Sequence, residues 1–185
     1  MNPSFSALET IPQRSSWRTY EPQPLPEELA KELRALFASP PATPFGHNVR
    51  LVIIDPIDEA QEKLKKLGTY GVIRGAYNFL CGAVQDNKGS IEDFGYVLEW
   101  AILRATAMGL GTCWLGGTFR RSAFGEAMEV QENEIIPAVT PIGYAKEKRS
   151  LVDKTFRWVA GSKKRKPWGA LFFRDDFAKA LKQDE

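Results

Sequence analysis

Apolar and polar residues recur along the chain at spacings that predict several helices and strands. Leucines return every three or four residues in PEELAKELRALF (26–37), which predicts a helix with one buried face. The apolar run VRLVII (49–54) predicts a buried strand, and the charged stretch DEAQEKLKKLG (58–68) predicts a second helix. An apolar face in EDFGYVLEWAILRATAM (92–108) predicts the longest helix, with a C-terminal cap at the GLG that follows it (109–111).

Further segments complete the predicted order of elements. GVIRGAYNFLCGAV (71–84) predicts a strand with small residues, against which another element packs closely. RSAFGEAMEV (121–130) predicts a short helix, and IPAVTPIGYA (136–145) a strand whose prolines suit strand entry or a sheet edge. SPPATPFGHN (39–48) predicts a loop, because proline disrupts a helix interior. This mixture of helices and strands favours an α+β fold built in layers.

Length and composition favour one globular domain. The chain has 185 residues, of which 43% are hydrophobic and 26% charged, as in ordinary folded domains. We assign residues 1–173 to this domain and 174–185 to a charged tail or helix. A formal net charge of +2 gives no support for a nucleic-acid or membrane partner. With no apolar leader at its start and no apolar run long enough to span a bilayer, we expect a soluble cytoplasmic protein.

The cysteine and histidine residues argue against several kinds of site. Cys81 and Cys113 lie far apart and share no metal-ligand spacing with the single histidine, His47. A disulfide framework or a metal site is therefore not indicated. His47 has no serine or carboxylate partner nearby in the sequence, so a catalytic triad is not predicted. Glu99 falls within the predicted long helix and requires a partner if it is buried.

A cluster of arginines and hydroxyl groups, RSSWRTY (14–20), lies near the amino terminus. Two guanidinium groups with hydroxyls between them can bind a phosphate through several charge-assisted hydrogen bonds. A solvated basic turn that caps the first element would have the same composition. The residues alone leave both interpretations open.

A glycine-rich cluster, GLGTCWLGGTF (109–119), follows the predicted long helix. Its glycines allow the backbone to approach a flat ligand closely, and exposed backbone amides can hydrogen-bond the polar edge of a ring. A tight helix-to-strand connection with a buried Trp114 explains the spacing equally well.

Four consecutive cations, KKRK (163–166), precede Pro167 and Trp168. Such a run is usually a solvated face or a loose nucleic-acid patch. Its other interpretation is a second group of cations on the phosphate that the cluster at 14–20 would bind. The small residues between 71 and 82 either leave room for a ring or pack against the long helix, and we favour packing.

Taken together and in order, these motifs resemble the nitroreductase family of flavoproteins. The resemblance rests on RSSWRTY (14–20), GLGTCWLGG (109–117), PAVTPIGYA (137–145) and KKRKP (163–167), together with the long helix before GLGTCW. It spans nearly the whole chain and points to a divergent branch of the family whose chains contain two degenerate halves. It implies a three-layer α-β-α sandwich that binds FMN, commonly at the interface of a homodimer.

The resemblance also implies roles for individual residues. Cations and hydroxyls would hold the phosphate and ribityl end of FMN, and the glycine-rich backbone would lie against the isoalloxazine ring with amides near N5 and O4. No catalytic acid or base is assigned, because the flavin carries the chemistry in such enzymes. The residues implied are Arg14, Ser15, Ser16, Arg18, Lys163 and Arg165 for the phosphate end, and Leu115, Gly116 and Gly117 for the ring.

One segment common in the family, Pro-Ser-x-Asn-x-Gln-Pro-Trp, has no counterpart in the comparable loop, which reads SPPATPFGHN (39–48). In the divergent branch that segment lies beyond the point where this chain stops. We therefore expect the chain to correspond to the first half of the family plus a basic connector.

The leading functional hypothesis is an FMN-dependent oxidoreductase. It would pass electrons from NADH or NADPH through bound flavin to a nitroaromatic, a quinone or a similar small acceptor. The alternative is a flavin-binding or partner-binding protein without turnover, which the missing family segment favours. A nucleic-acid module at 163–166 would lack interleaved aromatic residues for base stacking, and we expect no nucleic-acid partner.

Overall fold

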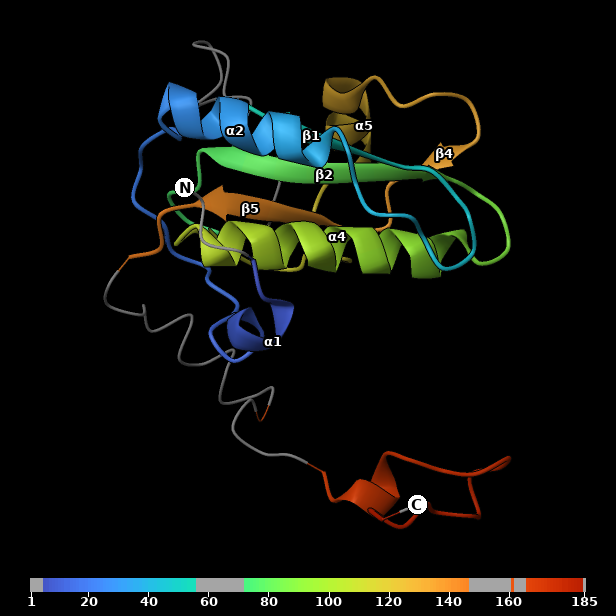
Figure 1. Cartoon of the computed structure of the whole chain (residues 1–185). Helices are drawn as coiled ribbons and strands as arrows, with labels where there is room; N and C mark the ends of the chain where they lie inside the picture. Colours follow the sequence, from blue (N-terminus) through green and yellow to red (C-terminus); the bar gives the residue numbers. More distant parts are fainter. Residues whose placement is uncertain (1–4, 56–71, 147–160, 162–165, 185) are drawn as a thin grey trace. The chain divides into compact units, whose positions relative to one another are not determined.

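The structure of the protein, a computed structural model, describes residues 5–55, 72–146, 161 and 166–184 (Figure 1). Two units follow each other along the chain, Met1–Ser150 and Leu151–Glu185. The helix predicted at 58–68 lies outside the described residues. Among the helices that are described, none is long and apolar enough to cross a membrane.

An antiparallel sheet forms the centre of the first unit. Its strands lie in the order β1-β2-β5-β3, and β4 pairs with β2 off this path. β1 coincides residue for residue with the strand predicted at 49–54, and β2 and β5 confirm the other two predicted strands. The strands are β1 (Val49–Ile54), β2 (Asn78–Gln85), β3 (Gly111–Thr112), β4 (Glu134–Ile135) and β5 (Val139–Gly143).

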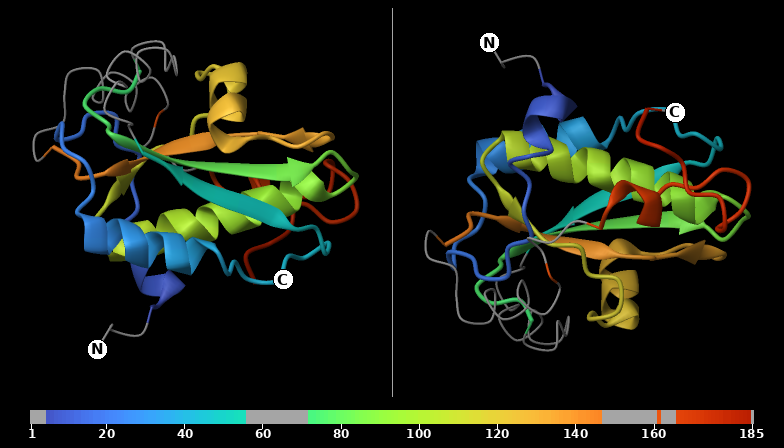
Figure 2. Two further views of the ribbon diagram at one scale, coloured as in Figure 1. Left: turned by 90° about the horizontal axis from the view of Figure 1, so that it is seen from above. Right: turned by 90° about the horizontal axis from the view of Figure 1, so that it is seen from below.

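Helices cover both faces of this sheet and complete the predicted three-layer α-β-α arrangement (Figure 2). α2 and α4 share one hydrophobic core with the sheet, and α5 shares the other. The short helix α1 contacts α4. α2, α4 and α5 confirm the helices that the apolar spacing predicts. The helices are α1 (Ala7–Thr10), α2 (Glu27–Phe37), α4 (Ser90–Ala107) and α5 (Arg121–Met128).

Side chains of β2 alternate between the two cores. Leu80 and Val84 join the core shared with α2 and α4, whereas Phe79, Cys81 and Ala83 join the core shared with α5. Each of these side chains is at most 3% exposed. Full burial of one large apolar side chain contributes roughly 1.5–3 kcal/mol, so this strand ties the two helical layers together.

The close packing predicted for the small residues of 71–84 occurs at Gly82. A Cβ atom there would lie 2.8 Å from the ring of Phe94 in α4 and 3.0 Å from Leu51 in β1. Ordinary contacts between carbon atoms are about 3.5–4.0 Å. A larger residue would displace these two side chains, and the packing interpretation is therefore confirmed at Gly82.

The long helix α4 ends as its sequence predicts. The Gly109 N–H donates to the carbonyl of Thr106 at 2.9 Å, and the Leu110 N–H donates to the carbonyl of Ala105 at 3.0 Å. This pair of bonds is the Schellman motif, in which a glycine in the left-handed region follows the last helical residues. Gly109 has a φ of 79°, and the chain turns there from α4 into β3.

Pro141 lies inside the sheet and corrects part of the expectation for 136–145. Pro137 precedes β5, as expected for a proline at strand entry. β5, however, is no edge strand, because it pairs with β2 on one side and β3 on the other. Pro141 stands opposite Phe79 of β2.

The pairing between β5 and the segment after β3 accommodates this proline. Leu115 and Val139 exchange both backbone hydrogen bonds, at 2.9 and 3.0 Å. In an antiparallel ladder the next such pair lies two residues along, where Pro141 faces Cys113. Proline has no N–H to donate to the Cys113 carbonyl. The Cys113 N–H donates to the Thr140 hydroxyl at 2.9 Å, and this hydroxyl donates to the Pro141 carbonyl at 2.8 Å.

The second unit carries no described residue that is fully buried. It contains a short 3-10 helix, Trp168–Ala170, and a bridge between Phe173 and Ala180. The rings of Trp168 and Phe172 stack with centroids 3.9 Å apart. Residues 174–184 form turns and this bridge rather than a helix.

Candidate functional site

The arginine-rich segment 14–20 lies alongside β3, at the start of the glycine-rich segment. Ser16 forms a parallel bridge with Thr112, and the Trp17 N–H donates to the Thr112 carbonyl at 2.8 Å. The fold therefore brings together two motifs that lie almost a hundred residues apart in the sequence.

The far end of segment 14–20 is held by a second stretch of backbone. The Arg74 N–H donates to the Arg18 carbonyl at 2.8 Å, and the Tyr20 N–H donates to the Arg74 carbonyl at 2.9 Å. Gly75 has a φ of +75°, and a Cβ there would lie 2.3 Å from the Tyr20 carbonyl oxygen. Tyr20 is 1% exposed, so this segment is anchored in the core while its arginines stay half-buried.

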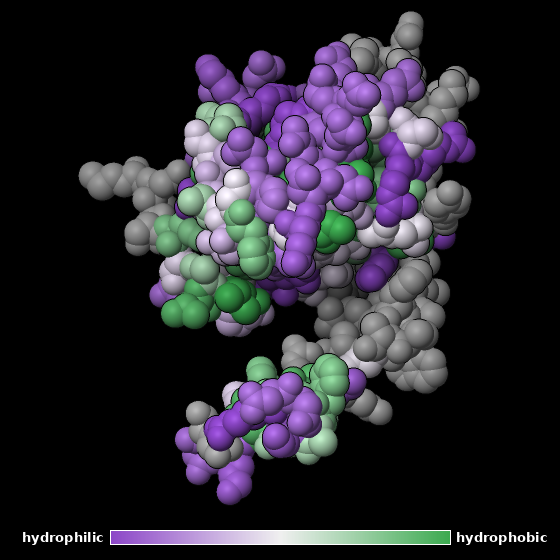
Figure 3. Space-filling model, turned by 90° about the vertical axis from the view of Figure 1, so that its right-hand side faces the viewer, coloured by the Kyte–Doolittle hydropathy of each residue, from purple (hydrophilic) through white to green (hydrophobic). Residues whose placement is uncertain are grey.

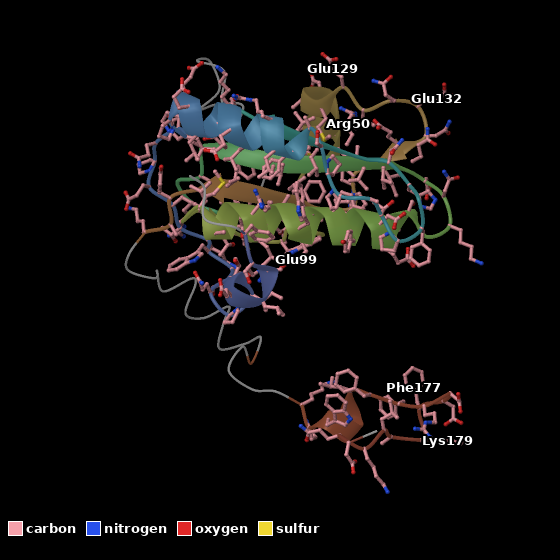
Figure 4. The ribbon with its side chains drawn as sticks, viewed as in Figure 1. Arg50, Glu99, Glu129, Glu132, Phe177 and Lys179 are labelled. Carbon is pink, nitrogen blue, oxygen red and sulfur yellow. The ribbon has the colours of Figure 1, made fainter. Side chains whose placement is uncertain are left out.

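Glu99 in α4, which is labelled in Figure 4, links the two motifs through its side chain. One carboxylate oxygen lies 3.3 Å from Nε of Arg14. The other accepts a hydrogen bond of 2.6 Å from the indole N–H of Trp114. The sequence predicts a partner for Glu99 if that residue is buried; its side chain is 38% exposed, and the structure identifies two partners.

The glycine-rich loop after Trp114 has a buried anchor and an open tip. Leu115 is 3% exposed and is bonded to β5 through Val139. Gly116 and Gly117 are exposed, and a Cβ on either would meet no atom within 4 Å. The loop therefore presents bare backbone at its tip.

A cleft of about 660 Å³ opens near this loop, between α5 and the stretch around β4. Arg121 joins the two features, because it lines the cleft and donates to the Gly116 carbonyl at 2.9 Å. The cleft is lined by Ile91, Arg121, Ser122, Gly125, Val130, Glu134, Ile135, Ile136 and Pro137.

The acidic residue of the cleft, Glu134, is paired with an arginine of β1. Glu134 lies 2.7 Å from Nη2 of Arg50, and the hydrogen bond from Arg50 holds the pKa of the Glu134 carboxyl below its usual value.

Figure 3 shows one face of the first unit, where hydrophilic side chains dominate and hydrophobic ones gather toward the lower left.

The cysteines and His47 have structural surroundings. Both cysteines are buried and free, and burial raises the pKa of the Cys81 thiol far above its usual value. His47 Nδ1 lies 2.8 Å from the buried carboxylate of Asp93, which also accepts from the backbone N–H groups of Phe45 and His47. Although burial alone raises the pKa of Asp93, these hydrogen bonds hold it below its usual value. Asp93 thereby anchors the proline-rich loop.

The described residues contain no group of histidine, cysteine and carboxylate side chains that could hold a metal ion. Lys163 and Arg165 lie outside the described residues, so their predicted place at the phosphate stays a prediction. The remaining site consists of cations, hydroxyls and backbone amides. Such groups can bind and orient an anionic ligand with a flat ring.

Three solved structures share this fold at 17–20% identity. A nitroreductase family protein from Clostridium difficile 630 (17% identical) matches with a TM-score of 0.64 over 91% of this chain and 98% of that chain. Nitroreductase A from Vibrio parahaemolyticus RIMD 2210633 (19%) gives 0.65 over 96% and 79%. A nitroreductase with bound FMN from Bacteroides fragilis NCTC 9343 (20%) gives 0.57 over 79% and 91%. The fold is thus that of the nitroreductases, as the motifs predict.

The family assignment follows from the sequence as a whole. The model of a family described as "Putative TM nitroreductase" matches residues 6–182. The chain therefore belongs to this nitroreductase family, which confirms the resemblance. A comparison with curated proteins gave no match.

Proposed function

We propose that the protein is an FMN-dependent oxidoreductase that passes electrons from NADH or NADPH to a nitroaromatic, a quinone or a similar small acceptor. The observation that carries the proposal is the pairing of Ser16 with Thr112 in a chain of the nitroreductase family. This pairing sets the arginine-rich segment beside the glycine-rich one. When bound, FMN supplies the redox chemistry, and the protein supplies binding, orientation and electrostatics.

The phosphate end of FMN would be held by segment 14–18. Arg14 and Arg18 supply guanidinium groups, and Ser15 and Ser16 supply hydroxyls; all of these residues are half-buried. A phosphate accepts short, charge-assisted hydrogen bonds from such groups, and partial burial limits competition from water. Lys163 and Arg165 would add positive charge from the basic connector.

The ring end would be held by backbone rather than by side chains. Leu115 is fixed on both sides by its bonds to Val139, while Gly116 and Gly117 leave open space beside their Cα atoms. A flat ring can therefore approach their peptide groups without meeting a side chain. Arg121 holds the Gly116 carbonyl, and the Leu115 N–H is taken by Val139. The amides of Gly116 and Gly117 are therefore the ones that would serve the polar edge of the ring.

Two further parts of the proposal concern the bound state. The nitroreductase from Bacteroides fragilis that shares the fold was solved with bound FMN, which supports the choice of cofactor. We also propose a homodimer as the functional unit, as the family resemblance implies. The loop Leu115–Gly117 (the ring loop) has an exposed, uncovered tip, which suits a site that a second copy completes.

The visible absorbance spectrum of the purified full chain tests the cofactor first. We expect a yellow protein from which about one FMN per chain is released on denaturation. A colourless protein that also fails to bind added FMN would refute the proposal. Gel filtration with and without FMN then tests the dimer, for which a monomeric mass in both states is the contrary result.

Turnover is tested separately with the flavin-loaded protein. We expect oxidation of NADH or NADPH that depends on an added quinone or nitroaromatic compound. Flavin binding without oxidation of either nucleotide would favour the binding protein without turnover.

A further inference from the structure

Glu99 lies in the middle of α4, between the arginine-rich segment and the ring loop of the proposed site. Figure 4 shows it at the level where α4 and α1 face each other. Its two carboxylate oxygens serve different partners, Arg14 through Oε1 at 3.3 Å and Trp114 through Oε2 at 2.6 Å. Trp114 directly precedes the loop Leu115–Gly117, and one carboxylate thus touches both ends of the site.

The Arg14 contact is partly shielded from solvent, with the side chains of Arg14 and Glu99 24% and 38% exposed. Its Nε atom is buried, and among the described residues it makes no hydrogen bond of good geometry. The Glu99 carboxylate is the acceptor placed beside it. A buried N–H without a partner costs free energy, so this carboxylate favours one orientation of the guanidinium. Because the contact uses Nε, the two terminal amino groups of the Arg14 guanidinium remain for an anion.

The contact between Glu99 and Trp114 acts on the ring end of the proposed site. The indole N–H can only donate, and its bond to Glu99 is short, as charge-assisted bonds are. The ring also packs edge-on against Phe94, with centroids 6.5 Å apart and planes at 74°. Trp114 is therefore held at its polar edge by Glu99 and at its apolar body by α4.

We propose that Glu99 is a positioning residue that sets Arg14 for the flavin phosphate and Trp114 for the ring loop at the same time. This inference rests on the proposed function, because it assumes that the two motifs bind one FMN. Glu99 touches neither end of the ligand itself and acts through its two partners. Its negative charge weakens the local positive potential, and the benefit lies in holding both partners before the ligand arrives.

Glutamine at this position distinguishes a two-partner role from simple packing. Glutamine has nearly the same shape, but it has one acceptor oxygen and a donating amide group. Glu99→Gln can therefore hold Arg14 or Trp114 through an oxygen, but not both. Glu99→Ala can hold neither. The matched control is Glu92→Gln, which makes the same change at an exposed position in the first turn of α4.

The experiment is titration of the full-length chain and its variants with FMN, followed by flavin fluorescence. We expect the Kd for FMN to rise about tenfold in Glu99→Gln and further in Glu99→Ala, as for loss of a hydrogen bond to a charged group. Glu92→Gln should stay within about twofold of the wild type. Riboflavin, which lacks the phosphate, should lose less affinity than FMN in Glu99→Gln, because Arg14 has no phosphate to meet.

A second measurement follows the link itself without flavin. The indole N–H signal of Trp114, assigned by its loss in Trp114→Phe, should shift in Glu99→Gln but not in Glu92→Gln. Thermal melting of each variant shows whether it is folded. If the wild type binds no FMN, the proposed function fails and this inference with it. If the wild type binds FMN and folded Glu99→Gln binds it equally well, the positioning role alone is wrong.

Discussion

The two ends of the proposed flavin site are built from different parts of the polypeptide. At the phosphate end, half-buried side chains of residues 14–18 carry the binding groups. At the ring end, Gly116 and Gly117 offer bare, exposed backbone, and the buried Leu115 holds it in place. Binding at the phosphate end depends on the side chains that are present. Binding at the ring end depends on the absence of side chains from the two glycines.

This difference decides how each end responds to substitution. Removing a cation takes away a binding group directly, whereas exchanging a side chain for any residue but proline leaves the backbone amide in place. The ring end can be disturbed by loosening the strand that carries it or by filling the open space beside its glycines. The predictions below use these routes.

Removal of both arginines should have the largest effect. We expect Arg14→Ala combined with Arg18→Ala to raise the Kd for FMN at least about a hundredfold, or roughly 2.7 kcal/mol, because two charge-assisted contacts are lost. Flavin content after purification and a fluorescence titration measure this. Lys31→Ala with Arg120→Ala removes the same charge at exposed positions and should retain flavin. Unchanged flavin content in the double arginine variant would remove segment 14–18 from the site.

Lysine in place of both arginines makes the comparison sharper. Lysine keeps the charge but lacks the planar fork of donors. We expect Arg14→Lys with Arg18→Lys to bind FMN with an affinity between those of the wild type and the alanine variant. Affinity equal to that of the wild type would mean that charge alone matters at this end.

Loosening the strand before the ring loop should mainly affect stability. Thr140 is fully buried, and its hydroxyl accepts from the Cys113 N–H where Pro141 interrupts the ladder. Thr140→Val keeps the shape and leaves that N–H unsatisfied, which should lower the free energy of unfolding by about 2 kcal/mol. Urea denaturation measures the change. Thr140→Ser restores the hydroxyl and should be more stable than the valine variant; the reverse order would show that the bond is unimportant.

The fold could be predicted from the sequence wherever burial imposes a regular spacing of apolar residues. The leucines of 26–37 and the apolar run at 49–54 mark one buried face of a helix and one buried strand, because side-chain direction follows local geometry. The position of Pro141 could not be predicted in this way. Whether a strand is internal depends on partners distant in sequence, and here a threonine hydroxyl links the Cys113 N–H to the Pro141 carbonyl.

The candidate site was predictable as separate motifs but not as an arrangement. The motifs at 14–20 and 109–117 have recognisable compositions, yet the pairing of Ser16 with Thr112 depends on the whole fold. The sequence indicated Glu99 only in part, since a carboxylate in a largely apolar helix needs a partner if it is buried. Its two partners come from segments on either side of α4 in the sequence, and no local pattern names them.

Filling the open space at the ring end should weaken flavin binding without disturbing the fold. A Cβ on Gly116 meets nothing within 4 Å, so Gly116→Val should melt within a few degrees of the wild type. In the flavin complex the same side chain would occupy the space of the ring, and we expect about a tenfold rise in the Kd for FMN, or roughly 1.4 kcal/mol. A folded Gly116→Val protein with wild-type affinity would place the ring elsewhere.

The smallest effect is expected at a glycine that differs from Gly116 in its surroundings. Gly125 lies within α5, and the nearest atom to an added Cβ is the Cβ of Val130 at 4.0 Å. Alanine fits there and favours the helix, so Gly125→Ala should raise the free energy of unfolding by about 0.5–1 kcal/mol. Urea denaturation and an FMN titration should show a more stable protein with unchanged affinity. A loss of FMN affinity equal to that of Gly116→Val would mean that the ligand reaches α5 and the cleft beside it, and the ring end would then extend beyond the loop.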